Sequence, residues 1–189
     1  RLPGEEVAAE AAFQAAIRLV PARADSHYNL GNLYLAQERY GLAIQAYKAS
    51  LFYDPNGHLV WLNLGISARE SGDLELARAS FNRCLLLNPK ESKGWCNLGL
   101  VCHQEERFRA AMHAYQQALL CDEAQSEAWV NLALTFNAQG QPDEALRCLL
   151  TGTSLDPDSG DALFNLALTR LLLGDFVEGW RLYESRFAS

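Results

Sequence analysis

Five asparagines recur with a spacing of 34 residues, and their amides are the side chains of this sequence best suited to a repeated interaction. They are Asn29, Asn63, Asn97, Asn131 and Asn165. A primary amide offers one acceptor and two donors, which matches the N–H and C=O of a peptide unit. A row of them could therefore hold an extended polypeptide by its backbone, each bond contributing about 0.5–1.5 kcal/mol. The same amides could instead bond neighbouring elements and serve only the scaffold, so both roles remain open.

Residue types that support catalysis are present, but they are not spaced for it. The four histidines include no pair at i and i+4, the spacing of a helical metal site. No Gly-x-x-x-x-Gly-Lys or Gly-x-Gly-x-x-Gly loop is present to cradle a phosphate. We therefore predict that this segment is not an enzyme, holds no metal and needs no cofactor.

Composition and charge narrow the function classes further. The chain has 189 residues, of which 49% are hydrophobic, and a formal net charge of -7, as expected for a globular protein. Its 16 Lys and Arg are scattered among 23 Asp and Glu, which argues against nucleic acid as a partner. No apolar run approaches the roughly 18–20 residues of a membrane span. The five cysteines are odd in number without a Cys-x-x-Cys pair, which favours a reducing compartment. We therefore predict a cytoplasmic location.

The asparagines belong to a repeat in which other columns stay in phase. Each Asn is followed by Leu and then by Gly or Ala, and a Trp-rich column stands two residues before it. A second small column follows, as at Ala77, with a bulky residue four positions later, as at Phe81. We expect Gly65 and Ala77 to let two helix backbones approach closely, with Trp and Phe filling the gap towards the next unit.

Each unit is predicted to be a pair of helices. Apolar residues follow helical spacing in both halves. Between the halves, Glu70–Asp73 predicts a turn in which a glycine ends one helix and an aspartate caps the next. A proline near the end of most units cannot continue the second helix.

This period resembles the tetratricopeptide repeat (TPR), with Trp-x-x-Leu-Gly in the first helix, Ala-x-x-x-Phe/Tyr in the second and a closing Pro. The resemblance covers essentially the whole chain and implies an all-α fold, a right-handed TPR α-solenoid of helix–turn–helix hairpins. We predict one TPR domain over 1–189, with a half repeat followed by about five repeats, at 1–23, 24–57, 58–91, 92–125, 126–159 and 160–189. Because the chain begins at Arg1 and stops within the last predicted helix, we expect it to be a fragment of a longer protein.

In TPR hairpins the first helix lines the concave wall, so the resemblance implies that the asparagine column points into a groove. Helical spacing adds flanking side chains to that column. The predicted peptide-binding residues are Asn29, Asn32, Asn63, Asn97, Asn131, Asn165, Tyr28, Leu62 and Phe164. Cys96 shares a column with Leu62, and it is the one cysteine that we single out for a test of reactivity.

We predict a protein–protein interaction module that binds an extended peptide or protein segment, with neither nucleic acid nor a membrane span involved. The unbroken asparagine run resembles the ladder of O-linked N-acetylglucosamine transferase, whose TPR groove holds substrate peptides by their backbone. Gly174–Arg186 resembles the closing repeat of bacterial TPR proteins that sit beside or are fused to glycosyltransferase domains. The alternatives are therefore the substrate-recruiting arm of a glycosyltransferase, with a domain following at the C-terminal end, or a self-associating scaffold.

A carboxylate clamp, the TPR mode that captures acidic C-termini of chaperones, fits the residues poorly. Such a clamp needs Lys and Arg converging on a terminal carboxylate. Asn32, Asn63 and Lys93 lie at matching positions, whereas Tyr28 and Asn97 stand where the pattern requires cations. We therefore disfavour this mode.

Overall fold

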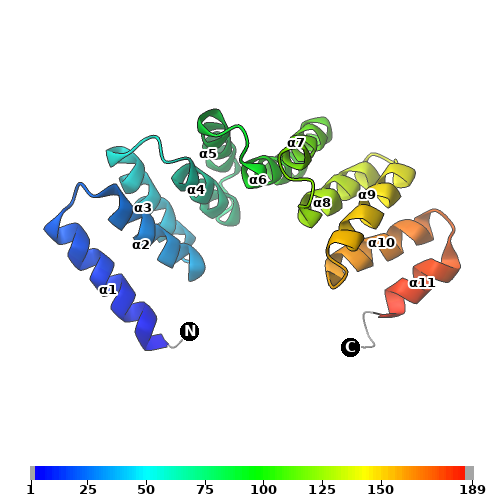
Figure 1. Cartoon of the computed structure of the whole chain (residues 1–189), viewed down its shortest axis with the longest axis horizontal. Helices are drawn as coiled ribbons and strands as arrows, with labels where there is room; N and C mark the ends of the chain where they lie inside the picture. Colours follow the sequence, from blue (N-terminus) through cyan, green and yellow to red (C-terminus); the bar gives the residue numbers. More distant parts are fainter. Residues whose placement is uncertain (1–2, 186–189) are drawn as a thin grey trace. The chain divides into compact units, whose positions relative to one another are not determined.

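The computed structural model describes residues 3–185, and all regular structure in that range is α-helical (Figure 1). The helices are α1 (Pro3–Leu19), α2 (Ala24–Ala36), α3 (Tyr40–Tyr53), α4 (His58–Glu70), α5 (Leu74–Leu87), α6 (Ser92–Gln104), α7 (Phe108–Cys121), α8 (Ser126–Ala138), α9 (Pro142–Leu155), α10 (Gly160–Leu172) and α11 (Phe176–Ser185). The prediction of an all-α fold is confirmed.

Successive helices pack in pairs, as the repeat predicts. Helix α2 packs on α3, α4 on α5, α8 on α9, and α10 on α11. The pattern of contacts between residues divides the chain into two compact units, Arg1–Gly94 and Trp95–Ser189, here called unit 1 and unit 2. Within unit 1 the first helices α2 and α4 also touch each other, and within unit 2 the same holds for α8 and α10. These contacts between first helices form the walls on which the candidate sites lie.

The turn between α4 and α5 shows how local sequence ends one helix and begins the next. Gly72 has a φ of +86°, a left-handed conformation that glycine adopts without steric penalty. The side chain of Asp73 then accepts a hydrogen bond from the backbone N–H of Leu76 at 3.0 Å. The predicted C-terminal glycine and N-cap aspartate are confirmed. In two equivalent turns the left-handed position is filled by Glu38 and Glu106, each with a φ of 57°.

The small column packs differently from the expectation stated above. A Cβ added at Gly65 would lie 2.5 Å from the Phe81 ring, and one added at Gly31 would lie 2.5 Å from the Tyr47 ring. Both aromatic side chains are fully buried. The glycine therefore makes room for a ring from the second helix of its own hairpin, rather than for a backbone.

The tryptophan column ties each hairpin to the loop that precedes it. The indole Nε1–H of Trp61 donates to the carbonyl of Pro55 at 2.9 Å, and Trp129 donates to the carbonyl of Glu123 at 2.9 Å. His27 occupies the same column, with its Nε2 2.8 Å from the carbonyl oxygen of Pro21. The indole and imidazole rings thus fix where the first helix begins.

Within residues 3–185, no helix combines the length and apolar character that crossing a bilayer requires.

Candidate functional site

Every predicted site residue lies on the first helix of a hairpin. Tyr28, Asn29 and Asn32 are on α2, Leu62 and Asn63 on α4, Asn97 on α6, Asn131 on α8, and Phe164 and Asn165 on α10. The structure brings some of them together within each unit. In unit 1 these are Tyr28, Asn32 and Asn63, and in unit 2 they are Asn131 and Asn165.

In unit 1 the predicted residues join a tyrosine–amide network, made of Tyr28, Asn32, Tyr47 and Asn63. Asn32 Oδ1 accepts two hydrogen bonds, from the Tyr47 hydroxyl at 2.8 Å and from Asn63 Nδ2 at 2.9 Å. Asn63 Nδ2 also lies 3.5 Å from the Tyr28 hydroxyl oxygen. Burial raises the pKa of the Tyr47 phenol far above its ordinary value, so this hydroxyl stays protonated and donates. The network ties α2 and α3 to α4.

This network uses part of the hydrogen-bonding capacity of its amides. The NH2 group of Asn63 points at two scaffold oxygens, which leaves its Oδ1 as the uncommitted atom. The oxygen of Asn32 is fully used, and its NH2 group donates to no other residue in the described range. Asn29 is exposed on the same helix. The wall of unit 1 therefore offers the Oδ1 atom of Asn63 and the NH2 group of Asn32 as polar groups that no other described residue binds.

Unit 2 has a hollow of about 340 Å³ on the corresponding wall, here called the α8–α10 hollow. Its lining residues are Ser126, Glu127, Val130, Asn131, Leu134, Asp156, Ser159, Asp161 and Asn165. Asn165 Nδ2 donates to the backbone carbonyl of Asp161 at 2.8 Å, and Asn131 Nδ2 lies 4.0 Å from Cys96 Sγ, a weak contact. Two predicted ladder amides thus line a concave, partly apolar space.

All the charged side chains that line the hollow are negative. Glu127, Asp156 and Asp161 contribute carboxylates, and none of the lining residues is Lys or Arg. In the part of the chain that the structure describes, none of these three carboxylates has an ion-pair partner. Sequence reasoning missed this convergence, because Glu127 opens the α8–α9 hairpin whereas Asp156 and Asp161 come after it in the chain.

Two residues expected on the accessible wall are buried instead. Leu62 is 5% exposed and Cys96 is 1% exposed. The predicted place of Cys96 in the groove column is therefore wrong as regards access, and Leu62 contributes to the core rather than to an accessible surface. Phe164 is half-buried, with its ring centroid 5.8 Å from that of Tyr183 on α11. Asn97 is half-buried on α6.

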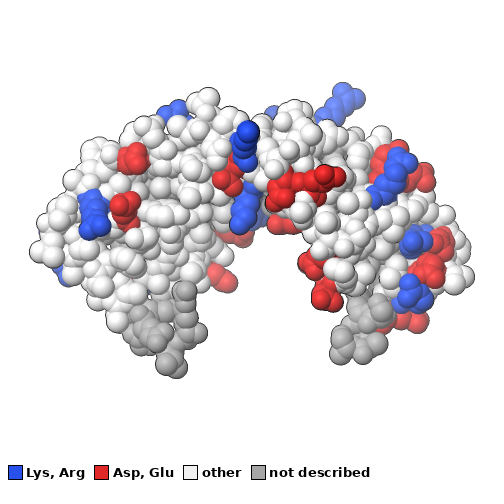
Figure 2. All heavy atoms as spheres, viewed as in Figure 1, with Lys and Arg blue, Asp and Glu red and all other residues white. Residues whose placement is uncertain are grey.

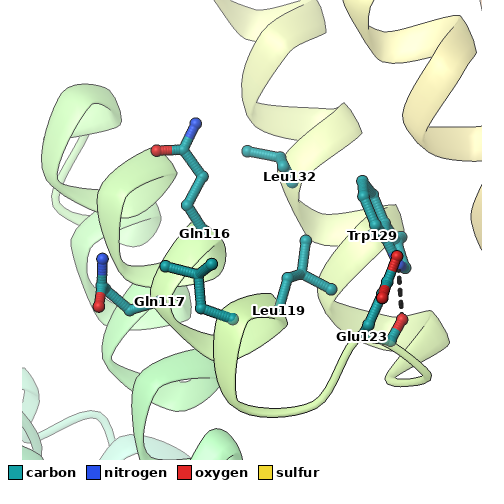
Figure 3. Close-up of a pocket in the computed structure, with 7 residues that line it drawn as sticks. Gln116, Gln117, Leu119, Glu123, Trp129 and Leu132 are labelled. Carbon is teal, nitrogen blue, oxygen red and sulfur yellow. Dashed lines mark hydrogen bonds between the residues drawn. The ribbon is translucent and has the colours of Figure 1, made fainter.

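A second hollow, of about 700 Å³, lies between α7 and α8 and was not predicted (Figure 3). It is lined by Gln116, Gln117, Leu119, Leu120, Glu123, Trp129 and Leu132. Its rim residue Leu120 is 78% exposed. The equivalent place in unit 1 forms a hollow of about 360 Å³ beside Trp61 and Phe52. The sequence signal was available, because Phe52, Leu86 and Leu120 recur in phase and are apolar.

The remaining charges and thiols show no sign of a reactive centre. On the face shown in Figure 2, Lys and Arg lie singly or beside Asp and Glu rather than in a continuous basic patch. Burial raises the pKa of the Cys84 and Cys148 thiols to about 11, so both stay protonated near neutral pH. Among residues 3–185, no group of three or more His, Cys, Asp or Glu is placed to hold a metal ion.

Paired helices at a 34-residue period, with a glycine against an aromatic ring in each early hairpin, define a protein of the TPR class. The chain belongs to the family described as the cilia and flagella-associated protein 70 C-terminal domain, whose model matches residues 1–183. No curated protein sequence matches the chain.

Solved structures of other TPR proteins are similar to the chain in fold. The crystal structure of MamA superposes with a TM-score of 0.73 at 23% identity, covering 82% of this chain and 91% of MamA. YrrB, a TPR protein with an unusual peptide-binding site, gives 0.72 at 22% identity over 90% of this chain and 88% of YrrB. PilF of Pseudomonas aeruginosa gives 0.83 at 19% identity over 95% of this chain and 82% of PilF. At these identities the likeness shows the fold alone.

Proposed function

We propose that this chain binds an extended polypeptide along the wall formed by the first helices of its hairpins. The contacts would come from the asparagine ladder, Asn29, Asn32, Asn63, Asn97, Asn131 and Asn165, with Tyr28 and Phe164 as flanking rings. The residues 1–189 would act as one TPR domain with the repeat boundaries given above. No bond-making step is assigned to it.

The state of the ladder amides carries this proposal. Asn63, Asn131 and Asn165 each turn their NH2 group towards the scaffold, and no described residue donates to their oxygens. None of these oxygens is among the buried side-chain atoms that lack a partner, so each reaches solvent. A peptide N–H could therefore donate to each of them.

The expected affinity is modest, because each bond contributes about 0.5–1.5 kcal/mol and the peptide loses conformational freedom on binding. Partly exposed apolar side chains such as Val130, Leu134 and Ile66 would add burial to these bonds. A TPR protein of the same fold, YrrB, is described as having a peptide-binding site, which supports a peptide as the class of ligand.

None of the five cysteines forms a disulfide, which supports the cytoplasmic setting predicted above.

Removal of the ladder amides tests the proposal. Peptides selected from a random twelve-residue display library would be measured by fluorescence anisotropy against the wild type and the triple variant Asn63→Ala, Asn131→Ala, Asn165→Ala. We expect binding to weaken at least about tenfold while the helical circular dichroism is retained, because three bonds are lost. A matched control replaces the exposed Asn56 and Asn82 by Ala. Unchanged affinity in the triple variant, or a library that yields no binder, would overturn the proposal.

Self-association is a second candidate, favoured by one observation on α11. Phe176, Val177 and Trp180 are all exposed on this helix, so it presents an apolar side without cover in the described range. Sedimentation at increasing concentration tests this candidate, with Trp180→Ala expected to keep the chain monomeric.

The glycosyltransferase-arm hypothesis has the motif at 174–186 as its support, and Arg186 of that motif lies outside the described residues.

A further inference from the structure

We propose that the α8–α10 hollow takes a cationic side chain, lysine or arginine, of the bound polypeptide. This inference rests on the proposed function, since it assigns a charge preference to one part of the same wall. It distinguishes unit 2 from unit 1 and predicts which peptides bind best.

The first support is charge. Glu127 on α8, Asp156 before α10 and Asp161 within α10 surround one hollow, with no Lys or Arg in its lining and no ion-pair partner in residues 3–185. Like charges gathered in one concavity repel each other and attract a cation. An occupant that carries a positive charge would relieve that repulsion.

The second support is the orientation of the polar groups, which is independent of the carboxylates. The Ser126 hydroxyl donates to the carbonyl of Gly152 at 2.9 Å, so that its proton is turned away from the hollow. Asn165 donates one N–H to the backbone carbonyl of Asp161 at 2.8 Å, and Asn131 turns its NH2 group towards Cys96. Each amide therefore has its oxygen and at most one N–H left to bind an occupant of the hollow. Acceptors therefore dominate the hollow, while lysine and arginine side chains are pure donors.

The third support is the apolar part of the lining. Val130 and Leu134 lie one helical turn apart on α8 and are both partly exposed. Long cationic side chains pack their methylene stems on such surface and keep the charged end among polar groups. The hollow thus suits both parts of a lysine or arginine side chain.

Unit 1 lacks this arrangement at the equivalent positions. Leu59 stands where unit 2 has Asp161, and Asn32 stands where unit 2 has Leu134. Asp54, the counterpart of Asp156, already accepts from the backbone N–H of Asn56 at 3.0 Å. Asp25 keeps the carboxylate of Glu127, but Tyr28 of the tyrosine–amide network stands where unit 2 has Val130. The charge preference therefore belongs to the α8–α10 hollow.

The test compares matched peptides from the selected set that differ at one position, carrying arginine, its neutral isostere citrulline, or glutamate. We expect the arginine peptide to bind about tenfold more tightly than the citrulline peptide at low salt, and the ratio to fall below about threefold at high salt. In the double variant Asp156→Asn, Asp161→Asn the ratio should fall below about threefold, because only Glu127 of the three carboxylates remains. The control variant Glu123→Gln, Asp143→Asn removes two exposed carboxylates of unit 2 outside the hollow and should leave the ratio unchanged.

A minimal probe separates this inference from the proposed function. N-acetylarginine methylamide at millimolar concentration should shift the side-chain amide resonances of Asn131 and Asn165, whereas the citrulline analogue should not. Equal shifts from both probes, or equal affinity of the arginine and citrulline peptides, would overturn the inference while leaving peptide binding intact. Loss of the peptides without loss of the arginine shifts would instead overturn the proposed function and support the hollow.

Discussion

The α2–α4 wall of unit 1 and the α8–α10 wall of unit 2 are built from positions that correspond three repeats apart, and both carry ladder asparagines. The first is covered by a hydrogen-bonded network, and the second opens into a hollow. The positions that differ include Tyr28, Asn32 and Leu59 in unit 1, which stand where unit 2 has Val130, Leu134 and Asp161.

The difference begins in the core of the hairpins. In unit 1 Tyr47 lies against Gly31, and its hydroxyl reaches Asn32 on the wall. In unit 2 the corresponding pair is Leu149 and Ala133, both fully buried and without a polar group to offer. A buried phenol thus supplies the donor that fixes an amide in unit 1. Where leucine replaces it, the amides of the wall depend on weaker or local partners.

The largest expected effect comes from filling the space beside Tyr47. Gly31→Leu should lower the free energy of unfolding by about 1–3 kcal/mol or more, because even a Cβ would lie 2.5 Å from the tyrosine ring. Urea unfolding followed by circular dichroism measures the loss. Gly41→Ala is the control, since nothing lies within 4 Å of a Cβ there. An unchanged unfolding midpoint for Gly31→Leu would contradict the packing of Tyr47 against Gly31, which distinguishes the wall of unit 1 from that of unit 2.

A smaller effect is expected from removing the hydroxyl of Tyr47 alone. Tyr47→Phe should cost about 0.5–1.5 kcal/mol, because Asn32 Oδ1 then keeps one donor, from Asn63, instead of two. Tyr53→Phe serves as the control, because that hydroxyl makes no hydrogen bond within the described chain. Equal stabilities of the two variants in urea would show that the hydrogen bond of the Tyr47 hydroxyl contributes nothing to the stability of unit 1.

The smallest effect is a pH dependence of stability that arises from His103 in unit 2. There Thr135 donates its hydroxyl proton to the carbonyl of Asn131 at 2.9 Å, so its oxygen accepts from Nδ1 of His103 at 2.9 Å. Burial lowers the pKa of His103 from its ordinary value of 6.5. The unfolded chain therefore binds the proton more readily, and stability should fall as the pH drops below about 6.5.

His103→Asn sharpens this prediction, because Asn137 makes the equivalent bond to Thr169 at 2.8 Å without an ionisable group. The variant should lose the pH-dependent part of the unfolding free energy between pH 7 and 5 while keeping its stability at neutral pH. In unit 1 the buried hydroxyl of Tyr47 stays protonated throughout this range, because burial raises its pKa. A pH profile identical to that of the wild type would exclude His103 as the source.

The predicted hairpins follow from information that is local in the chain. The period of 34 residues places every column on a known face of a helix, so the all-α fold and the turn at Gly72 and Asp73 could be predicted directly. First helices begin at residues 24, 58, 92, 126 and 160, one at each period. Helical spacing also placed the ladder on the first helices.

What the sequence could not decide is which side chains meet across hairpins. Leu62 and Cys96 occupy the same column as Val130, yet they are buried while Val130 is partly exposed. Likewise the amide of Asn63 is engaged with Asn32, whereas that of Asn165 is engaged with its own helix. A helical period gives the direction of a side chain, but burial and hydrogen bonding depend on how closely the next hairpin packs and on the size of its side chains.

By itself the sequence thus determined the repeat, the helices, the turns and the helix faces, because each depends on residues within one period. Only the tertiary structure decided that one wall joins two tyrosines and two amides in a network, while the other gathers three carboxylates from separate elements around a hollow. The physical reason is that hydrogen bonds and charges act over a few ångströms in space, at distances that stacking of the hairpins sets and spacing along the chain does not.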